Sequence, residues 1–224
     1  MEWLLEYGDS RLRVVCDKDL RSASLSELIL HYDSLVDYIN RNPLFRISYE
    51  PLEVGAGAPH VARLMAQAAE SCGVGPMAAV AGAFSQVVGE FLVSNGGGNI
   101  IVDNGGDIYL NLSEDKVVKI YAGLSKMPKE ISLKVSAGET PMGICTSSAT
   151  VGPSISLGDA DAVTVVADSA VVADAAASAV GNEVKGSLGV EKGIARAEAI
   201  SLIRGVVIVR GDKLGLWGSL PEIV

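Results

Sequence analysis

Hydrophobic residues recur every three or four positions through most of the first hundred residues, which is the spacing of a buried helix face. This spacing predicts three helices, over residues 24–42, from Pro59 onward, and over residues 76–95. Ser24 and Glu27 form a capping-box pattern at the start of the first helix. Pro59 and Pro76 fit the first turns of the other two. Short strands are expected over residues 11–16 and within residues 45–54.

After residue 98 the spacing changes to the alternation of a strand. Strands are predicted over residues 99–103, 107–112, 117–121, 131–135, 143–146, 162–167 and 206–209. A short polar turn at residues 113–115 predicts that the third of these strands pairs with the second as a hairpin. Further helices are expected through residues 173–180, capped by Asp168 or Ser169, and over residues 194–203. Helices followed by mixed strands and helices predict an α+β fold, with one domain over residues 1–224 and a mixed, largely antiparallel sheet.

Composition narrows the classes of function. The chain has 224 residues with 18 Lys and Arg against 27 Asp and Glu, so its formal net charge is −9. This acidic balance, without a basic cluster, argues against binding to nucleic acid or to an anionic membrane surface. Hydrophobic residues make up 49% of the chain, which predicts an ordered globular protein. Small-molecule and protein partners remain as the expected classes of ligand, and composition leaves the oligomeric state open.

Cysteine and histidine are too sparse for a metal or disulfide scaffold. The three cysteines are widely separated, and His31 and His60 lie 29 residues apart, so neither a zinc site nor a disulfide framework is expected. Acidic residues stand where a signal peptide needs basic ones, so we expect a cytoplasmic protein without an export signal. The uncharged stretch between Glu70 and Glu90 is rich in Gly and Ala, which predicts a buried helix and not a membrane span.

Two short segments have residue types suited to ligand binding. In Asn104-Gly105-Gly106-Asp107, paired glycines let a ligand approach the backbone, and the aspartate offers a carboxylate; the alternative is an ordinary break between strands. Asp174 and Ser178 are four residues apart, so they share one face of the predicted helix. A carboxylate and a hydroxyl are oxygen ligands that Mg²⁺ accepts together with phosphate oxygens. The alternative is a solvated acidic residue near the start of a helix.

These segments together resemble the ApbE family, whose members are FAD-dependent FMN transferases that attach flavin to protein threonines. The family pattern is a glycine-rich helix, a strand ending in Gly-Gly-Asp, a valine-rich strand, and Ala-Asp-Ala-x-Ala-Thr opening a helix. All four parts occur in order within residues 72–182, notably in 99–108 and 162–178. The chain is most similar to a largely archaeal and bacterial branch, for which residues 73–82 and 211–218 are characteristic.

The resemblance implies an ApbE-like fold and FAD or FMN as the ligand. It implies that Mg²⁺ is held by Asp174 and Ser178, with serine where the transferases usually have threonine. The Asn104–Asp107 segment would face the flavin diphosphate. Cys145, Thr146 and Ser147 align near a stretch that lies beside the flavin in the family.

The sequence departs from the transferase pattern at two places. Ala81 stands where the transferases have lysine, and the segment before Asp161 lacks the family's histidine. We therefore expect a divergent protein that binds a flavin or another diphosphate ligand with Mg²⁺ but transfers FMN poorly or not at all. An accessory protein that kept only the pocket is one alternative. Another is an accessory protein in sulfide assimilation and homocysteine formation that uses the Cys145 thiol, against the simpler interpretation of Cys145 as a buried, inert residue.

Overall fold

The computed structural model describes residues 1–121, 130–148 and 158–224. Its main element is a sheet of eight strands in which every neighbouring pair is antiparallel. In spatial order these are β1 (Glu2–Tyr7), β2 (Ser10–Val15), β3 (Ile100–Asn104), β4 (Asp107–Asn111), β7 (Met142–Ser147), β8 (Ala162–Ala167), β9 (Ile203–Arg210) and β10 (Lys213–Gly218). Strand β8 is buried along its whole length, as its run of valines predicts.

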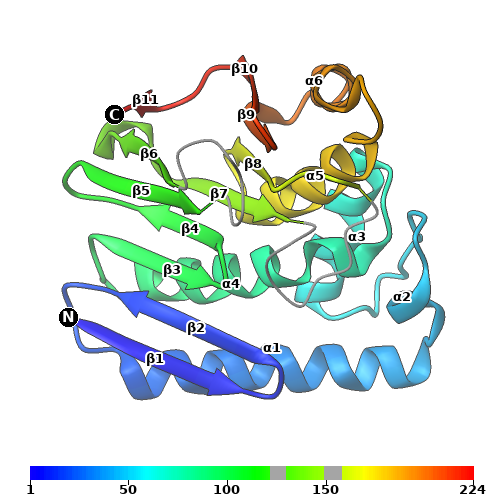
Figure 1. Ribbon diagram of the computed structural model, residues 1–224. Helices are drawn as coiled ribbons and strands as arrows, with labels where there is room; N and C mark the ends of the chain where they lie inside the picture. Colours follow the sequence, from blue (N-terminus) through cyan, green and yellow to red (C-terminus); the bar gives the residue numbers. More distant parts are fainter. Residues whose placement is uncertain (122–129, 149–157) are drawn as a thin grey trace.

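Helices cover one face of this sheet (Figure 1). They are α1 (Arg21–Arg41), α2 (Leu44–Ile47), α3 (His60–Cys72), α4 (Val80–Ser94), α5 (Ala170–Glu183) and α6 (Gly189–Glu198), with a 3₁₀ turn η1 (Pro76–Ala79) leading into α4. Alanines dominate the buried side of α5, where six of them are fully or almost fully enclosed. Small side chains let α5 pack close to both the sheet and α4, and this packing builds the site described below.

A second sheet of three strands packs on the other face. It consists of β5 (Lys116–Tyr121), β6 (Glu130–Val135) and β11 (Glu222–Ile223), in the order β11-β6-β5, and a second 3₁₀ turn, η2 (Ala137–Glu139), follows β6. Val118 and Leu133 join Ile144 of the main sheet in one buried cluster. The expected hairpin between β4 and β5 is therefore wrong: β5 pairs with β6, and β7 takes the place beside β4.

Other expectations fail at the ends of elements. Helix α1 begins at Arg21 without a side-chain cap, and Ser24 instead donates to the Arg21 carbonyl within the helix. Residues 45–54 form no strand; part of the segment is the short helix α2. The last helix ends at Glu198, and Ile203 already begins β9. The α+β class and the largely antiparallel sheet are confirmed.

Helix α4 with its leading turn is apolar and long enough to cross a membrane by length and composition alone, over Pro76–Ser94. In the fold it lies against β3, β4 and α5, and Phe84, Val88 and Leu92 are buried in the core. The packing matches the expected buried helix.

Candidate functional site

Helices α4 and α5 pack against each other near their starts, and Gly82 lies at this contact. A Cβ atom at Gly82 would lie 2.3 Å from the Ala170 carbonyl oxygen and 2.8 Å from the Asp174 Cβ. Only a residue without a side chain fits this contact, because real Cβ atoms do not approach so closely. The glycine of the predicted glycine-rich helix is therefore a packing residue, and it brings the Asp174 carboxylate to the start of α4.

Each of these helices provides a side chain that accepts hydrogen bonds from groups at the start of the other. The Asp174 Oδ2 atom accepts a hydrogen bond of 2.8 Å from the Gly82 N–H, in the first turn of α4. In return, the Gln86 Oε1 atom of α4 accepts bonds from the Ser169 hydroxyl (2.8 Å) and the Val171 N–H (3.3 Å) at the start of α5. Free N–H groups in the first turn of a helix attract a carboxylate. Asp174 thus has a structural role whatever else it does.

The Asn104–Asp107 segment is a tight turn between β3 and β4. Gly105 and Gly106 have φ values of +69° and +104°, which is the backbone that two-residue hairpin turns require and that glycine adopts without strain. No atom lies within 4 Å of a Cβ placed at either glycine, so this turn borders open space. The backbone conformation of the turn therefore explains why both residues are glycine, and the absence of side chains also leaves the backbone accessible to a ligand.

Two hydrogen bonds tie this turn to the start of α4. The Asn104 side-chain amide donates to the Ala81 carbonyl at 3.3 Å. The Ser85 hydroxyl donates to the Asp107 carbonyl at 2.6 Å. As a result the glycine turn, the start of α4 and the second turn of α5 meet at one place, although they are far apart in the sequence.

Two carboxyl groups approach each other where these elements meet. Both residues keep some exposed surface, but protein atoms surround the carboxyl groups themselves. Burial raises the pKa of Asp174 to about 7, although hydrogen bonds from the Gly82 and Ala81 N–H groups lower it. Burial also raises the pKa of Asp107 well above its usual range, and the nearby charge of Asp174 raises it further. A cation at this place would relieve the repulsion and favour both ionised carboxylates.

The available oxygen ligands suit Mg²⁺ better than a metal ion that needs three or more protein side chains. Within the described part of the chain, no group of three or more His, Cys, Asp or Glu side chains is placed to hold a metal ion. Mg²⁺ does not need such a group, because it is usually bound by one or two carboxylates together with waters and phosphate oxygens. Asp174 and Asp107 fit that pattern.

Three other predicted site residues have different surroundings. Ser178 lies one turn after Asp174 on α5 and is partly exposed, as is Ser147 near the end of β7. The Thr146 hydroxyl is 2.8 Å from the hydroxyl of Thr164, its partner on β8. Because neighbouring side chains alternate along a strand, this hydroxyl lies on the opposite face of the sheet from Cys145 and α5. The Thr146 backbone N–H donates to the Gly106 carbonyl at 3.2 Å, and its nearness to Asp107 lowers the pKa of that carboxyl group.

Cys145 is fully buried opposite Asp107, its partner on β4. Its thiol donates to the Ala170 carbonyl at 3.3 Å. Burial raises the pKa of this thiol well above its usual range, and the negative charges of Asp107 and Asp174 raise it further. A low-pKa thiolate is the reactive form of cysteine, so these surroundings favour a packing role.

Sequence reasoning missed Ser85 and Gln86. These polar residues lie in the first half of a mostly apolar helix, and their hydrogen bonds hold Asp107 and the start of α5 in place. A polar pair on a buried helix is a usable signal, because buried polar groups need partners. The segment before Asp161 that lacks the family's histidine lies partly outside the described residues, over 154–157.

Known proteins resemble this chain over most of its length. The family model described as AbpE bacteria matches residues 2–205. The chain belongs to this ApbE-like family. A UPF0280 protein of Methanococcus maripaludis is 45% identical over 195 residues, covering 85% of this chain and 79% of that protein. A UPF0280 protein of Methanocella arvoryzae is 40% identical over 219 residues, covering 98% of this chain and 89% of the relative.

Solved structures show the same fold at much lower identity. The apo form of the Pseudomonas stutzeri flavinyl transferase ApbE superposes with a TM-score of 0.58 at 12% identity, covering 97% of this chain and 93% of that one. The flavin transferase ApbE from Vibrio cholerae, as an H257G mutant, gives a TM-score of 0.55 at 16% identity, with coverages of 99% and 98%. The ApbE-like fold is thereby confirmed.

Proposed function

We propose that this ApbE-like protein binds FAD, FMN or another anionic ligand of the diphosphate type where the glycine turn, α4 and α5 meet. The observation that supports this most is the pair of enclosed carboxyl groups, Asp107 and Asp174, beside a glycine turn that borders open space. Asp174 and Ser178 are the proposed Mg²⁺ ligands, with Asp107 close by. Bound Mg²⁺ would neutralise diphosphate charge. The flavin transferases among the structural neighbours support flavin as the ligand.

The protein's own residues have separate tasks in this proposal. The Gly82 N–H orients the Asp174 carboxylate through their 2.8 Å hydrogen bond. Asn104 and Ser85 fix the glycine turn against α4, so that Gly105 and Gly106 present their backbone to the diphosphate. Ser147, on the same face of β7 as Cys145, is a proposed contact of the ligand at the edge of the site. No proton transfer or bond cleavage needs to be assigned for binding alone.

Equilibrium dialysis with FAD tests the proposal. We expect the protein to retain flavin absorbance when Mg²⁺ is present and to lose it when EDTA removes the metal, because diphosphate and carboxylates repel each other without a cation. Asp107→Asn should weaken retention, and Asp37→Asn, which changes an exposed aspartate on α1, should not. Equal retention with and without Mg²⁺ would contradict the proposed role of the metal, and no retention at all would contradict the ligand.

We expect little or no transfer of FMN to a threonine-bearing acceptor protein. Ala81 provides no cation at the position where the transferases have lysine. Its backbone carbonyl already accepts a hydrogen bond from the Asn104 side chain. The measurement is in-gel flavin fluorescence of an acceptor after incubation with FAD and Mg²⁺, with an authentic transferase as the positive control. Efficient labelling would show that the transfer chemistry survives without that lysine.

The surroundings of Cys145 do not support a role in sulfur handling, since the thiol is buried and donates a hydrogen bond to the Ala170 carbonyl. We expect Cys145→Ser to unfold in urea with a loss of about 1 kcal/mol, because the serine hydroxyl can keep a hydrogen bond to the same carbonyl. FAD retention should not change. A Cys145→Ser protein that is stable but no longer binds FAD would show that the thiol has a direct role.

Within this proposal the protein acts in the cytoplasm. All three cysteines are free and buried, which suits a reducing compartment. An acceptor or client protein is the proposed macromolecular partner, and the structural neighbours named as flavin transferases support that class of partner.

A further inference from the structure

Strands β1 and β10 form the two edges of the eight-stranded sheet (Figure 1). An edge strand presents unpaired backbone N–H and C=O groups, to which another strand can bind. Charge opposes such binding at β1, because Glu2 and Glu6 lie along this strand. Both are exposed, and they form salt bridges with Arg13 and Arg11 of β2. Charged side chains of this kind are a common protection of an edge strand against further pairing.

Strand β10 lacks this protection. Its one charged residue is Lys213, at the turn from β9. Leu214 and Leu216 follow, and these side chains are 41% and 48% exposed. Their partners on β9, Val209 and Val207, are buried in the cluster beneath the second sheet, so the two leucines extend an apolar face to the end of the sheet. An exposed apolar edge of this kind is a site at which another strand pairs.

The backbone of β10 also has the groups that pairing requires. The two-residue turn at 211–212 makes Arg210 and Lys213 a hydrogen-bonded pair, and bonded positions alternate along the strand from there. The backbone N–H and C=O groups of Leu214 and Leu216 therefore point away from β9. In the part of the chain that the structure describes, no other strand or loop forms hydrogen bonds with them.

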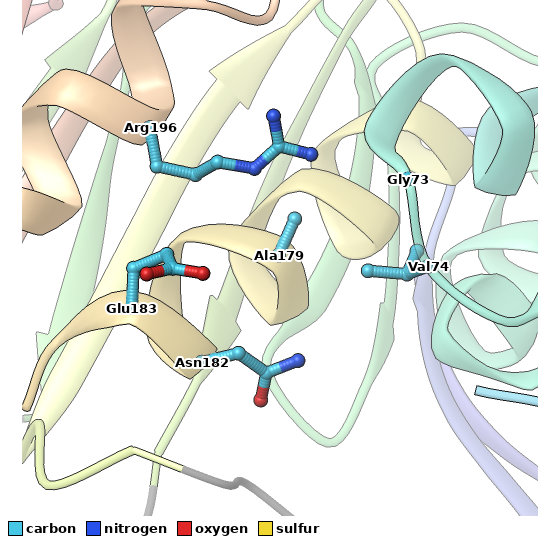
Figure 2. A pocket seen from close by; sticks show the side chains of 6 residues that line it. All are labelled: Gly73, Val74, Ala179, Asn182, Glu183 and Arg196. Carbon is cyan, nitrogen blue, oxygen red and sulfur yellow. The ribbon is translucent and has the colours of Figure 1, made fainter. Parts of the chain in front are cut away.

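Helix α6 lies between this edge and a cleft next to the proposed ligand site. On one side of α6, Val190 packs so closely on β10 that a Cβ atom at Gly215 would lie 2.5 Å from it. On the other side is an open cleft of about 340 Å³ (Figure 2), lined by Gly73, Val74, Ala179, Asn182, Glu183 and Arg196. Asn182 follows Ser178 by four residues on α5, so the cleft continues the helix face that has the proposed metal ligands. The outer edge of β10 is thus a different surface from the proposed ligand site.

We propose that β10 pairs with β10 of a second copy of this chain, antiparallel and about a two-fold axis at Gly215. In this register Leu214 of one copy lies directly opposite Leu216 of the other, and the outward backbone groups of both residues form hydrogen bonds. The same register places Lys213 opposite Trp217 of the second copy, and an indole ring is a favourable neighbour for a cation. Strand β10 is therefore complementary to itself, as a two-fold interface requires.

Sedimentation velocity over a range of protein concentrations tests the proposal. We expect a monomer–dimer equilibrium with a Kd on the order of 10 µM, because one pair of short strands buries less surface than a permanent dimer does. Leu214→Lys combined with Leu216→Lys places like charges opposite each other in both pairs, and should weaken association about 100-fold. Leu214→Glu combined with Leu216→Lys places opposite charges in both pairs instead, so association should return at low salt.

Leu4→Lys is the matched control. Leu4 is 44% exposed on β1, at the opposite edge of the sheet, so this change should leave the dimer intact. All of these substitutions alter exposed side chains, and circular dichroism should show the same folded protein in each case. The two lysine-containing double variants have the same backbone and differ only in charge at position 214, so they separate the register from general effects on the strand.

The proposal is overturned if the unaltered protein remains a monomer up to about 500 µM, which would leave the β10 edge to a different protein chain. It is also overturned if the protein with Leu214→Lys and Leu216→Lys dimerises like the unaltered one, because the contact would then lie elsewhere. If Leu214→Glu with Leu216→Lys associates no better than the variant with two lysines, the proposed register is wrong.

Discussion

Replacing Asp174 with asparagine is expected to stabilise the unliganded protein at about pH 8 and, at the same time, to weaken FAD binding with Mg²⁺ about 100-fold. An asparagine side-chain oxygen can still accept the Gly82 N–H, so the cap on α4 survives. The amide has no negative charge, so the repulsion from Asp107 disappears together with the charge that Mg²⁺ requires. Stability and function thus change in opposite directions.

The pH dependence of this effect follows from the direction of the pKa shift. Asp174 has a pKa of about 7 in the folded protein, against about 3.9 in an unfolded chain. Between these values the folded state binds more protons, so the free energy of unfolding of the unaltered protein falls as pH rises from about 4 to about 7. The Asp174→Asn protein lacks this titration. Its advantage should be near zero at about pH 4 and on the order of 2 kcal/mol at about pH 8.

Urea unfolding at several pH values measures this difference, and dialysis with FAD measures the binding. Asp37→Asn is the matched control, because this aspartate is exposed on α1 and should affect neither quantity. The interpretation fails if Asp174→Asn is less stable than the unaltered protein at every pH, or if it binds FAD equally well.

The second large effect is expected from Gly82→Ala. The added methyl group would overlap the Ala170 carbonyl oxygen and the Asp174 Cβ, and both belong to the backbone or the rigid base of a side chain. Helices α4 and α5 must separate to admit it, which also lengthens the Asp174–Gly82 hydrogen bond. We expect a loss of about 3 kcal/mol in the free energy of unfolding, or roughly 6–12 °C in Tm.

Gly105→Ala is the control for this substitution. Its Cβ atom meets nothing within 4 Å, but the backbone is at φ +69°, so only conformational strain of about 1 kcal/mol is expected. Thermal unfolding followed by circular dichroism compares the two variants. Equal losses would show that the close contact between α4 and α5 is not what makes glycine necessary at position 82.

Local patterns in the sequence predicted most of the elements, because alternation and helical spacing report burial directly. The β8 strand and the Ser169 cap of α5 are examples, since both depend on neighbours in the chain. The pairing of β5 could not be predicted in this way. Val118 and Ile120 bury the same face whether the strand joins β4 or β6, so alternation is identical in the two arrangements.

The predicted ends of helices were wrong for a related reason. Ser24 is four residues after Leu20, and its hydroxyl finds an acceptor inside α1, so the capping pattern appears without capping the helix. Helix α6 begins at Gly189, before the start of the helix predicted over residues 194–203, and it contains Gly193, where a Cβ atom would lie 2.7 Å from Ile208. For the site, the sequence named Asp174 and Asp107 as separate candidates, but only the fold reveals that the charge of one carboxyl group acts on the other.

The central claim is that a divalent cation binds at Asp174 beside the glycine turn, together with a diphosphate ligand. Anomalous diffraction from crystals grown with Mn²⁺ and FAD tests it most directly, because Mn²⁺ replaces Mg²⁺ at oxygen ligands and is located without assumptions about the flavin. The account predicts an anomalous peak about 2.1 Å from an Asp174 carboxylate oxygen, with phosphate density next to Gly105 and Gly106. Bound FAD with no peak at Asp174, or a peak at a different place in the fold, would contradict it.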